Sequence, residues 1–280
     1  MAAALLLPLH NVQSPLCSRR LPDPRRRHPA PPSSSSSLAL RFRSSPHHIH
    51  RHLRTLGFQV SSSTPAEKLA YILSTLDYLR SRGFPEAQFP RLAFLCPGIF
   101  SSPDAVPALD LLFAFLTGEV AASPEQACGL IARCPALLTA SVDFRLRPTL
   151  LLLRELGVTD LSSPTALNAH LLNTPAEKLA FKVKFLQGLG FSYQEAAQVC
   201  ARLPAIFGYS VENNLRPKVE YLVNQMGRSI EEIKAFPQYF AFSLEKRIVP
   251  RHLHLMERNL TIPLQKMLLW GDERFYAKWK

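Results

Sequence analysis

The sequence lacks the local motifs that mark the common classes of enzyme. It contains no G-x-x-x-x-G-K-[ST], G-x-G-x-x-G, G-x-S-x-G or H-E-x-x-H pattern. This excludes the usual phosphate-binding loops, the hydrolase nucleophile turn and the zinc-protease helix. The sequence also lacks a run of 18 apolar residues, so no membrane-spanning helix is expected. We therefore expect a protein that is not an enzyme and has no membrane partner.

Cysteine is scarce, and metal-ligand patterns are missing. No two cysteines form a C-x-x-C pair, and His252 and His254 stand two residues apart without a Cys or carboxylate set to complete a site. We therefore expect no metal and no cofactor. The four cysteines after residue 57 are predicted to be buried thiols: Cys96, Cys128, Cys134 and Cys200.

Acidic residues are almost absent from residues 1–57. This segment has nine Arg, nine Ser and six His but a single acid, Asp23. It is too poor in apolar side chains to offset an ordering entropy of about 1–2 kcal/mol per residue. An Arg- and Ser-rich, acid-poor segment is typical of an organelle transit peptide; the alternative is a secretory signal peptide, because Ala2–Leu7 is apolar. We expect residues 1–57 to be a disordered transit peptide and residues 58–280 to be the folded domain.

The charge of the remaining chain is small and unevenly distributed. The whole chain carries +12, and residues 1–57 account for +8 of it. Residues 58–143 hold five basic and eight acidic residues, whereas residues 144–258 hold fifteen and ten. A nucleic-acid function therefore has to be argued from where the cations lie and not from the overall charge.

Several anchors repeat along the chain with one period. The heptapeptide Thr-Pro-Ala-Glu-Lys-Leu-Ala occurs at residues 64–70 and 174–180, 110 residues apart. Glycines that follow apolar runs are spaced by 35, 39, 33 and 37 residues: Gly83, Gly118, Gly157, Gly190 and Gly227. Prolines that precede apolar pairs are spaced by 38, 69 and 33 residues: Pro97, Pro135, Pro204 and Pro237. All series fit a period near 36 residues, with one proline anchor lost near Leu172.

Helix-start signals define what each repeat contains. Thr64 and Thr174 are each followed by Pro and, three residues later, by Glu, which predicts capping boxes that open a first helix. Ser123, Ser192 and Ser229 have the same spacing to Glu or Gln and open a second helix. The sequence therefore predicts an all-α fold. Five full units and a sixth partial unit stack as an α-solenoid, because one helix pair cannot bury its own apolar face.

The anchors resemble the motifs of the mitochondrial transcription termination factor (mTERF) family. The resemblance lies in Cys134-Pro-Ala-Leu-Leu, Leu203-Pro-Ala-Ile-Phe, Asn214-Leu-Arg-Pro-Lys, the segment 242–251 and the ending 272–278. It covers about residues 64–280. It implies a superhelix of units with two helices and a short 3₁₀ turn at the proline anchor. It also implies nucleic-acid binding in organelle gene expression, in the chloroplast or, alternatively, the mitochondrion of a plant.

Basic residues recur in the early part of the predicted first helices. Stacked repeats would bring equivalent positions side by side, so these cations are predicted to form a track that neutralises phosphates. Solvated-face charges or structural ion pairs are the alternative, since Glu177, Glu212, Glu220 and Glu245 interleave with them. The candidate nucleic-acid-binding residues are Arg145, Arg147, Lys178, Lys182, Lys184, Arg216, Lys218, Lys246, Arg247 and Arg251.

Aromatic residues give a weaker signal. A role in base stacking is open to them, but at their spacings we expect core positions: Phe181, Phe185, Phe207, Tyr209, Tyr221, Tyr239 and Phe240. The function expected first is that of a monomer that binds duplex DNA and regulates organelle transcription or its termination, with the transcription machinery as a further partner. The alternatives are an RNA-binding factor for splicing or transcript maturation, and a protein-binding solenoid scaffold.

Overall fold

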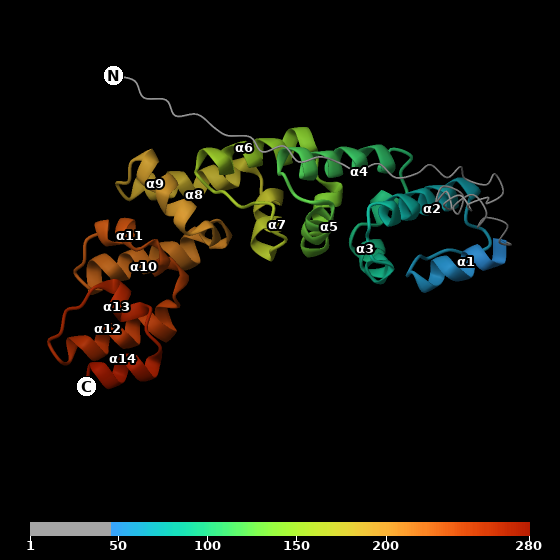
Figure 1. Ribbon diagram of the computed structural model, residues 1–280. Helices are drawn as coiled ribbons and strands as arrows, with labels where there is room; N and C mark the ends of the chain where they lie inside the picture. The colour runs from blue at the N-terminus through green and yellow to red at the C-terminus, as the bar shows by residue number, and fades with distance from the viewer. Residues whose placement is uncertain (1–45) are drawn as a thin grey trace, which may run out of the picture. The chain divides into compact units, whose positions relative to one another are not determined.

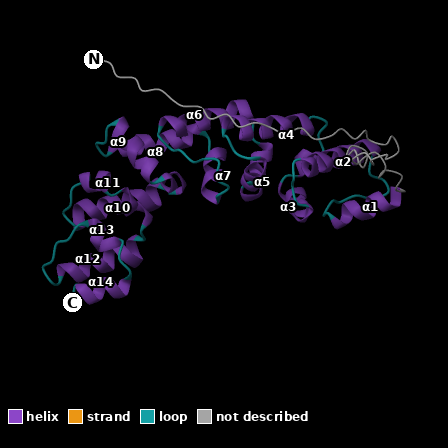
Figure 2. Cartoon of the chain, in the orientation of Figure 1, coloured by secondary structure: helices purple, strands orange, loops and turns teal. Residues whose placement is uncertain are grey.

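Helices make up all the regular structure that we describe. The computed structural model describes residues 46–280, and no strand occurs in this part of the chain (Figure 2). The predicted all-α repeat fold is confirmed.

Six helix pairs follow one another between α1 (Pro46–Thr55) and α14 (Asp272–Lys278). The first helices of the pairs are α2 (Ala66–Ser81), α4 (Ala105–Ala114), α6 (Arg147–Glu155), α8 (Ala176–Gly188), α10 (Arg216–Glu220) and α12 (Val249–Met256). The second helices are α3 (Phe89–Leu95), α5 (Pro124–Arg133), α7 (Ala166–Asn173), α9 (Tyr193–Arg202), α11 (Glu231–Ala235) and α13 (Leu264–Leu268). First helices contact first helices, as α6 contacts α8, and second helices contact second helices, as α5 contacts α7 (Figure 1).

The proline anchors start short 3₁₀ helices, as expected. Each begins at its Pro, which needs no partner for a missing N–H at a helix start: η2 (Pro97–Phe100), η4 (Pro135–Thr139), η6 (Pro204–Gly208) and η9 (Pro237–Ala241). Apolar side chains of these turns, such as Ile99, Leu137 and Ile206, are buried. The unit without a proline anchor has no such turn, since α7 ends at Asn173 and Thr174 leads directly into the next unit.

A second set of prolines shapes the starts of three first helices. Pro148, Pro217 and Pro250 each follow a widened π-helical turn: η5 (Val142–Leu146), η7 (Val211–Leu215) and η10 (Leu244–Ile248). A proline ring inside a helix displaces the carbonyl four residues earlier and cannot bond to it, which accounts for the widening. Each turn is capped by a serine whose hydroxyl accepts from the third following N–H: Ser141, Ser210 and Ser243.

The predicted capping boxes are correct for two serines and wrong for both threonines. Ser123 and Ser192 form complete boxes with Gln126 and Glu195. The helices after Thr64 and Thr174 instead begin at the prolines, which take the N-cap position and offer no side-chain cap. The Thr64 hydroxyl accepts from the Ser61 N–H, and the Thr174 hydroxyl donates to the His170 carbonyl. Ser229 forms no box either, because the N-cap of α11 is Ile230.

Four of the five predicted glycine anchors end first helices in the left-handed conformation. The φ angles are +89° at Gly83, +77° at Gly157, +97° at Gly190 and +60° at Gly227; glycine adopts this region without a Cβ clash. The prediction for Gly118 is wrong. That residue lies inside the widened turn η3 (Phe115–Glu119), and Ala121, with φ +61°, takes the left-handed position instead.

The expectation of disorder up to residue 57 is also wrong in part. Residues 46–55 form α1, and Leu53 and Leu56 behind its basic and His-rich surface are buried. The helix ends at Thr55 and is followed by Gly57, with φ +85°, and the Arg54 side chain donates to the Val60 carbonyl. The composition of the segment did not indicate this helix, because two leucines packed into the core are enough to anchor a short helix. Residues 1–45 of the expected transit peptide lie outside the described residues.

A single cluster of buried apolar side chains runs through the helix pairs, from Leu53 to Phe275. It contains the four cysteines, which are buried free thiols as predicted. Burial raises the pKa of the Cys200 thiol to about 12. Within residues 46–280 no single helix could cross a membrane, although Ala105–Glu119 and Pro124–Arg133, bent by 117°, are long and apolar enough together.

Candidate nucleic-acid interface

One register position of the first helices carries ties to backbone carbonyls. At the eighth residue after the Ser or Thr that precedes each of the last four first helices, the side chain donates a hydrogen bond to a backbone carbonyl. We call this bond a tie; its acceptor lies in or directly after the second helix or 3₁₀ turn of the same unit. Thr75 of α2 forms a similar tie, although it stands eleven residues after Thr64. The pairs are Thr75 to Ile99, Thr149 to Thr174, Lys182 to Tyr209, Lys218 to Phe240, and Arg251 to Met267. This position therefore links the first helix to the end of the unit in the last four helix pairs.

Three of the ten predicted phosphate-binding residues occupy this position. Lys218 is 4% exposed, and its Nζ donates to the Phe240 carbonyl at 2.7 Å and to Asn214 Oδ1 at 2.8 Å. Burial lowers the pKa of Lys218 to about 8 and also lowers that of Lys182. Arg251 is 1% exposed and donates to the carbonyls of Met267 and Trp270 and to Asp272. Lys218 and Arg251 are buried and Lys182 is half-buried. None of the three can reach a phosphate without breaking its tie, so the prediction of a track of ten cations is corrected.

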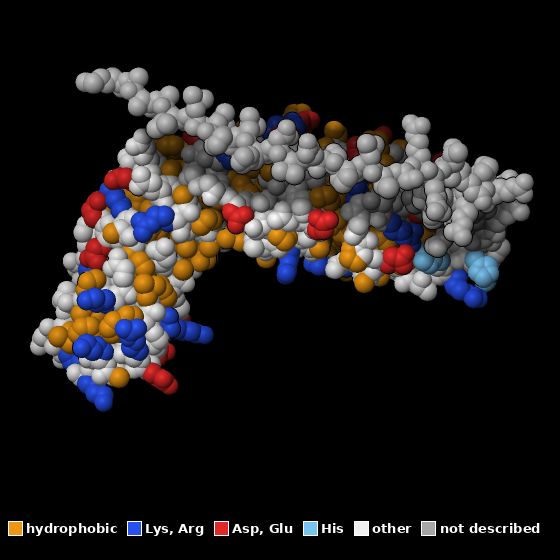
Figure 3. All heavy atoms as spheres, in the orientation of Figure 1, with side chains coloured by type: hydrophobic (Ala, Val, Ile, Leu, Met, Phe, Trp, Pro, Cys, Tyr) orange, Lys and Arg blue, Asp and Glu red, His pale blue; other side chains and the backbone are white. Residues whose placement is uncertain are grey.

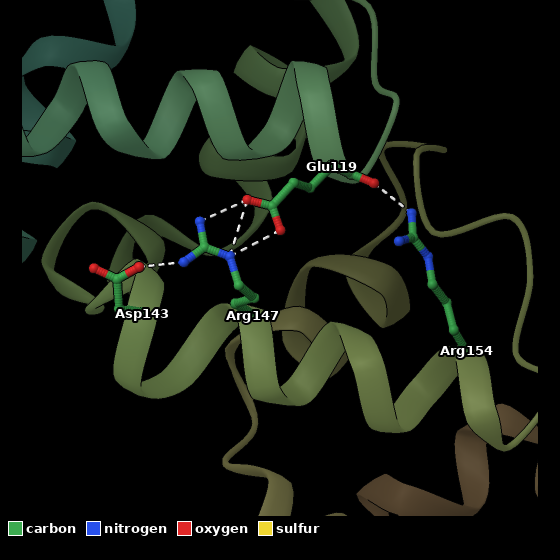
Figure 4. Close-up of polar contacts among 4 residues, drawn as sticks. All are labelled: Glu119, Asp143, Arg147 and Arg154. Atoms are coloured by element: carbon green, nitrogen blue, oxygen red, sulfur yellow. Dashed lines mark hydrogen bonds and ion pairs between the residues drawn. The ribbon is translucent and has the colours of Figure 1, made fainter.

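Three further candidates have acidic partners. Arg147 donates to both carboxylate oxygens of Glu119, at 2.7 and 3.0 Å, and to Asp143 (Figure 4). The backbone carbonyl of Glu119 also accepts from Arg154, so two arginines of α6 hold this residue of the preceding unit. The hydrogen bond from Arg147 holds the pKa of Glu119 below its usual range. Such an arginine is already neutralised, and a phosphate would have to displace the carboxylates.

Arg216 and Arg247 are paired less tightly. Arg216 donates to Glu212 at 2.8 and 3.1 Å and lies 5.8 Å from the centre of the Phe185 ring. Arg247 is 3.9 Å from Asp272 and lies 5.5 Å from the centre of the Phe242 ring. Exposed pairs of this kind contribute about 0–1 kcal/mol, so a phosphate could exchange with the carboxylate.

Four candidates are exposed and form no ion pair or hydrogen bond with any described side chain or carbonyl. We call these residues the free cations: Arg145, Lys178, Lys184 and Lys246. Arg145 and Lys178 share one register position, four residues after Ser141 and Thr174 respectively. Lys246 stands three residues after Ser243, one position earlier, and Lys184 stands ten residues after Thr174, six positions later. They are the members of the predicted set that can meet a phosphate without losing a protein partner.

The free cations fall into two groups. Arg145, Lys178 and Lys184 belong to the neighbouring units of α6 and α8, which contact each other. Lys246 precedes α12, and the corresponding positions of the unit between them hold Asn213, Asn214 and Glu220. The predicted track is therefore interrupted at α10.

A further group of cations, which was not predicted from the sequence, lies near the C-terminal end. Figure 3 shows Lys and Arg side chains among hydrophobic ones over the C-terminal helices. Arg274 lies 4.2 Å from the centre of the Trp270 ring, and Trp270 stacks on Trp279 with 17° between the planes. The exposed cations there are Lys246, Lys266, Arg274, Lys278 and Lys280. They could have been found from their density, four basic residues within 266–280, but they do not follow the repeat register.

Both histidines considered as metal ligands have protein partners. His252 Nδ1 lies 2.9 Å from the Tyr221 hydroxyl, and His254 Nε2 lies 2.6 Å from the Trp279 carbonyl. Within residues 46–280 no group of three or more His, Cys, Asp or Glu side chains could hold a metal ion. Within the described residues the exposed cations therefore remain the candidate ligand-binding groups.

Comparison with known proteins gives a family match. The mTERF family model matches residues 119–276, more than half of the chain. Transcription termination factor MTERF2, chloroplastic, of Arabidopsis thaliana is 35% identical over 127 residues, which are 44% of this chain and 20% of that protein. Arabidopsis MTERF8, chloroplastic, is 26% identical over 198 residues, 58% of this chain and 39% of that protein. Zea mays MTERF4, chloroplastic, is 29% identical over 98 residues, 35% of this chain and 20% of that protein.

The matched segment thus spans between a fifth and two-fifths of these relatives. All three are named chloroplastic, which supports the expected chloroplast location, with the mitochondrion as the alternative.

Proposed function

The chain belongs to the mTERF family, and from this premise we propose that it binds duplex DNA in the chloroplast and regulates transcription or its termination there. The relatives it matches are named transcription termination factors. In this proposal the chain acts by occupying nucleic acid and by contacts with the transcription machinery, and it catalyses no reaction.

The observation that carries the proposal is the set of free cations. Arg145, Lys178, Lys184 and Lys246 lie on the first helices or the turns that open them, exposed and without acidic partners. Cations placed at a repeated position meet phosphates at regular intervals, and each neutralised phosphate releases counterions from the nucleic acid. Phosphates carry no sequence information, so these residues give affinity and orientation, while the choice of sequence comes from other contacts.

The salt dependence of binding tests this proposal. The full chain is titrated with a fluorescently labelled duplex from the chloroplast genome at several salt concentrations. Each phosphate contact contributes about −0.9 to the slope of log K against log salt, so four contacts predict a slope near −4. Binding that is absent, or that does not change with salt, would contradict the proposal and favour the protein-binding scaffold.

RNA is the second candidate ligand because of one observation. Phe144, beside the free cation Arg145, is 91% exposed. Exposed aromatic rings beside cations are typical of proteins that stack on unpaired bases, which RNA offers more often than duplex DNA does. A chloroplast transcript that binds more tightly than the duplex of the same sequence would move the function to RNA maturation.

A further inference from the structure

Two phenylalanines of neighbouring units, one in η5 and one in α8, are exposed to solvent. Phe144 is 91% exposed and Phe181 is 57% exposed. We expected Phe181 in the core, and that prediction is wrong; Phe207, Tyr239 and Phe240 are buried as predicted. Large apolar side chains in water mark surfaces that bind something when they gather in one place.

Both rings lie near the start of their unit's first helix. Phe144 lies in the turn η5 that opens α6, three residues after Ser141, and Phe181 lies in α8, seven residues after Thr174. Residues four apart lie on the same face of a helix, and α6 contacts α8. The two rings therefore face the same side of adjacent units.

Three of the four free cations surround the rings. Arg145 follows Phe144 directly, and Lys178 and Lys184 precede and follow Phe181 by three residues, one helical turn. None of the three has an ion pair or hydrogen bond within the described residues. We call these five residues the α6–α8 patch: Arg145, Lys178, Lys184, Phe144 and Phe181.

We infer that the α6–α8 patch binds a single-stranded segment of nucleic acid, with phosphates on the three cations and unpaired bases stacked on the two rings. The inference rests on the proposed function, because the cations alone would accept the phosphates of a duplex equally well. The phenylalanines make the difference. In a duplex each base is stacked on its neighbours, so an exposed ring finds no free base face, whereas every unpaired base offers one.

An acidic amphipathic helix is a ligand of a different class for the same surface. Leu151, seven residues after Phe144 and 59% exposed, extends the apolar face in a way that suits such a helix. Two flat rings that each have a cation within one turn favour the nucleic acid, since both parts of the patch then have a partner in every nucleotide. The helix is an outcome of the test.

The test compares oligothymidine, which forms no duplex with itself, with a duplex of the same length. We use the full chain, the double variant Phe144→Ala/Phe181→Ala and the matched control Leu111→Ala, an exposed apolar residue of α4 outside the patch. Stacking predicts that each lost ring weakens single-strand binding about tenfold, with little change on the duplex and an unchanged salt slope. Phe144→Trp keeps a ring at this position, so it should keep single-strand binding at full strength, and the fluorescence of the new tryptophan should be quenched by oligothymidine.

The outcomes separate this inference from the proposed function. If the full chain binds neither probe in a salt-dependent way, the proposed function fails and the inference with it. If both probes bind and the double variant binds oligothymidine as tightly as the unaltered chain, the inference is overturned and the proposed function stands. Binding of an acidic helical peptide that depends on both phenylalanines, without single-strand binding, overturns it in favour of protein docking. Circular dichroism of the double variant shows whether it is folded.

Discussion

The buried lysine of α10 makes the stability of the protein depend on pH in a predictable direction. Lys218 has a pKa of about 8 in the folded chain because it is buried, against about 10.4 when it is exposed in the unfolded chain. Between these values the unfolded chain binds more protons than the folded chain, so the free energy of unfolding rises with pH. Below pH 8 the lysine is charged in both states, and the cost of burying that charge is fully present.

The magnitude follows from the difference between the two pKa values. At about 1.4 kcal/mol per pKa unit, the folded chain gains roughly 3 kcal/mol from this residue as pH rises from about 7 to about 10.5. Lys218→Met removes the titrating group and the donor to the Phe240 carbonyl. The stability of the unaltered chain minus that of the variant should therefore increase by roughly 3 kcal/mol over this range.

Urea unfolding followed by circular dichroism at a series of pH values measures this difference. The other titrating groups are shared by both proteins and cancel. Lys184→Met is the matched control, since it removes an exposed lysine without a protein partner, and it should change stability by less than about 0.5 kcal/mol. A difference for Lys218→Met that is constant or decreases with pH would refute the reasoning.

Four other substitutions test the packing, the ties and one ion pair. Gly129→Ala places a Cβ 2.7 Å from the Pro164 side chain, so it should lower the free energy of unfolding, measured by chemical denaturation, by about 1–3 kcal/mol. The Cβ of Gly188→Ala in α8 meets nothing within 4 Å, so this change should raise the free energy of unfolding by about 0.5–1 kcal/mol. Arg251→Lys keeps the charge but loses the fork that joins Met267, Trp270 and Asp272, so unfolding should become easier by on the order of 3 kcal/mol; an unchanged melting temperature would show that the fork is unimportant. The contact of Arg147 with Glu119 lowers the pKa of that carboxyl, so it stabilises the fold at pH values above 4.5, the ordinary pKa of this group. In Arg147→Gln, the free energy of unfolding should therefore fall less steeply below about pH 4.5 than in the unaltered chain. Parallel acid-unfolding curves would contradict this.

The repeats could be predicted because their signals are local. A proline that starts a 3₁₀ turn and a glycine that ends a helix act through their own backbone. The roles of Pro135 and Gly157 can therefore be predicted correctly from a few neighbouring residues in the sequence. Thr174 was misread because two local signals compete. The proline that follows it takes the N-cap position, and the hydroxyl bonds backward to the preceding helix instead.

The binding surface could be predicted only in part because the partner of each cation is far away in sequence. Lys218 is tied to a carbonyl 22 residues later, and Arg147 to a carboxylate 28 residues earlier. Charge and register are alike for Arg145 and Arg247, and only the three-dimensional contacts separate the free cation from the paired one. The exposure of Phe144 likewise depends on which face of its helix the neighbouring unit covers.

The central claim is that the free cations contact phosphates, and one variant tests it directly. Replacing all four with Gln, in Arg145→Gln/Lys178→Gln/Lys184→Gln/Lys246→Gln, leaves every tie and ion pair of the described residues in place. The slope of log K against log salt should flatten by roughly 3 to 4 units. Arg51→Gln/Arg133→Gln removes two exposed cations that lie outside the register of the free cations and have no partner among the described residues, and it should leave the slope unchanged. A folded quadruple variant that keeps the slope of the unaltered chain would contradict the account.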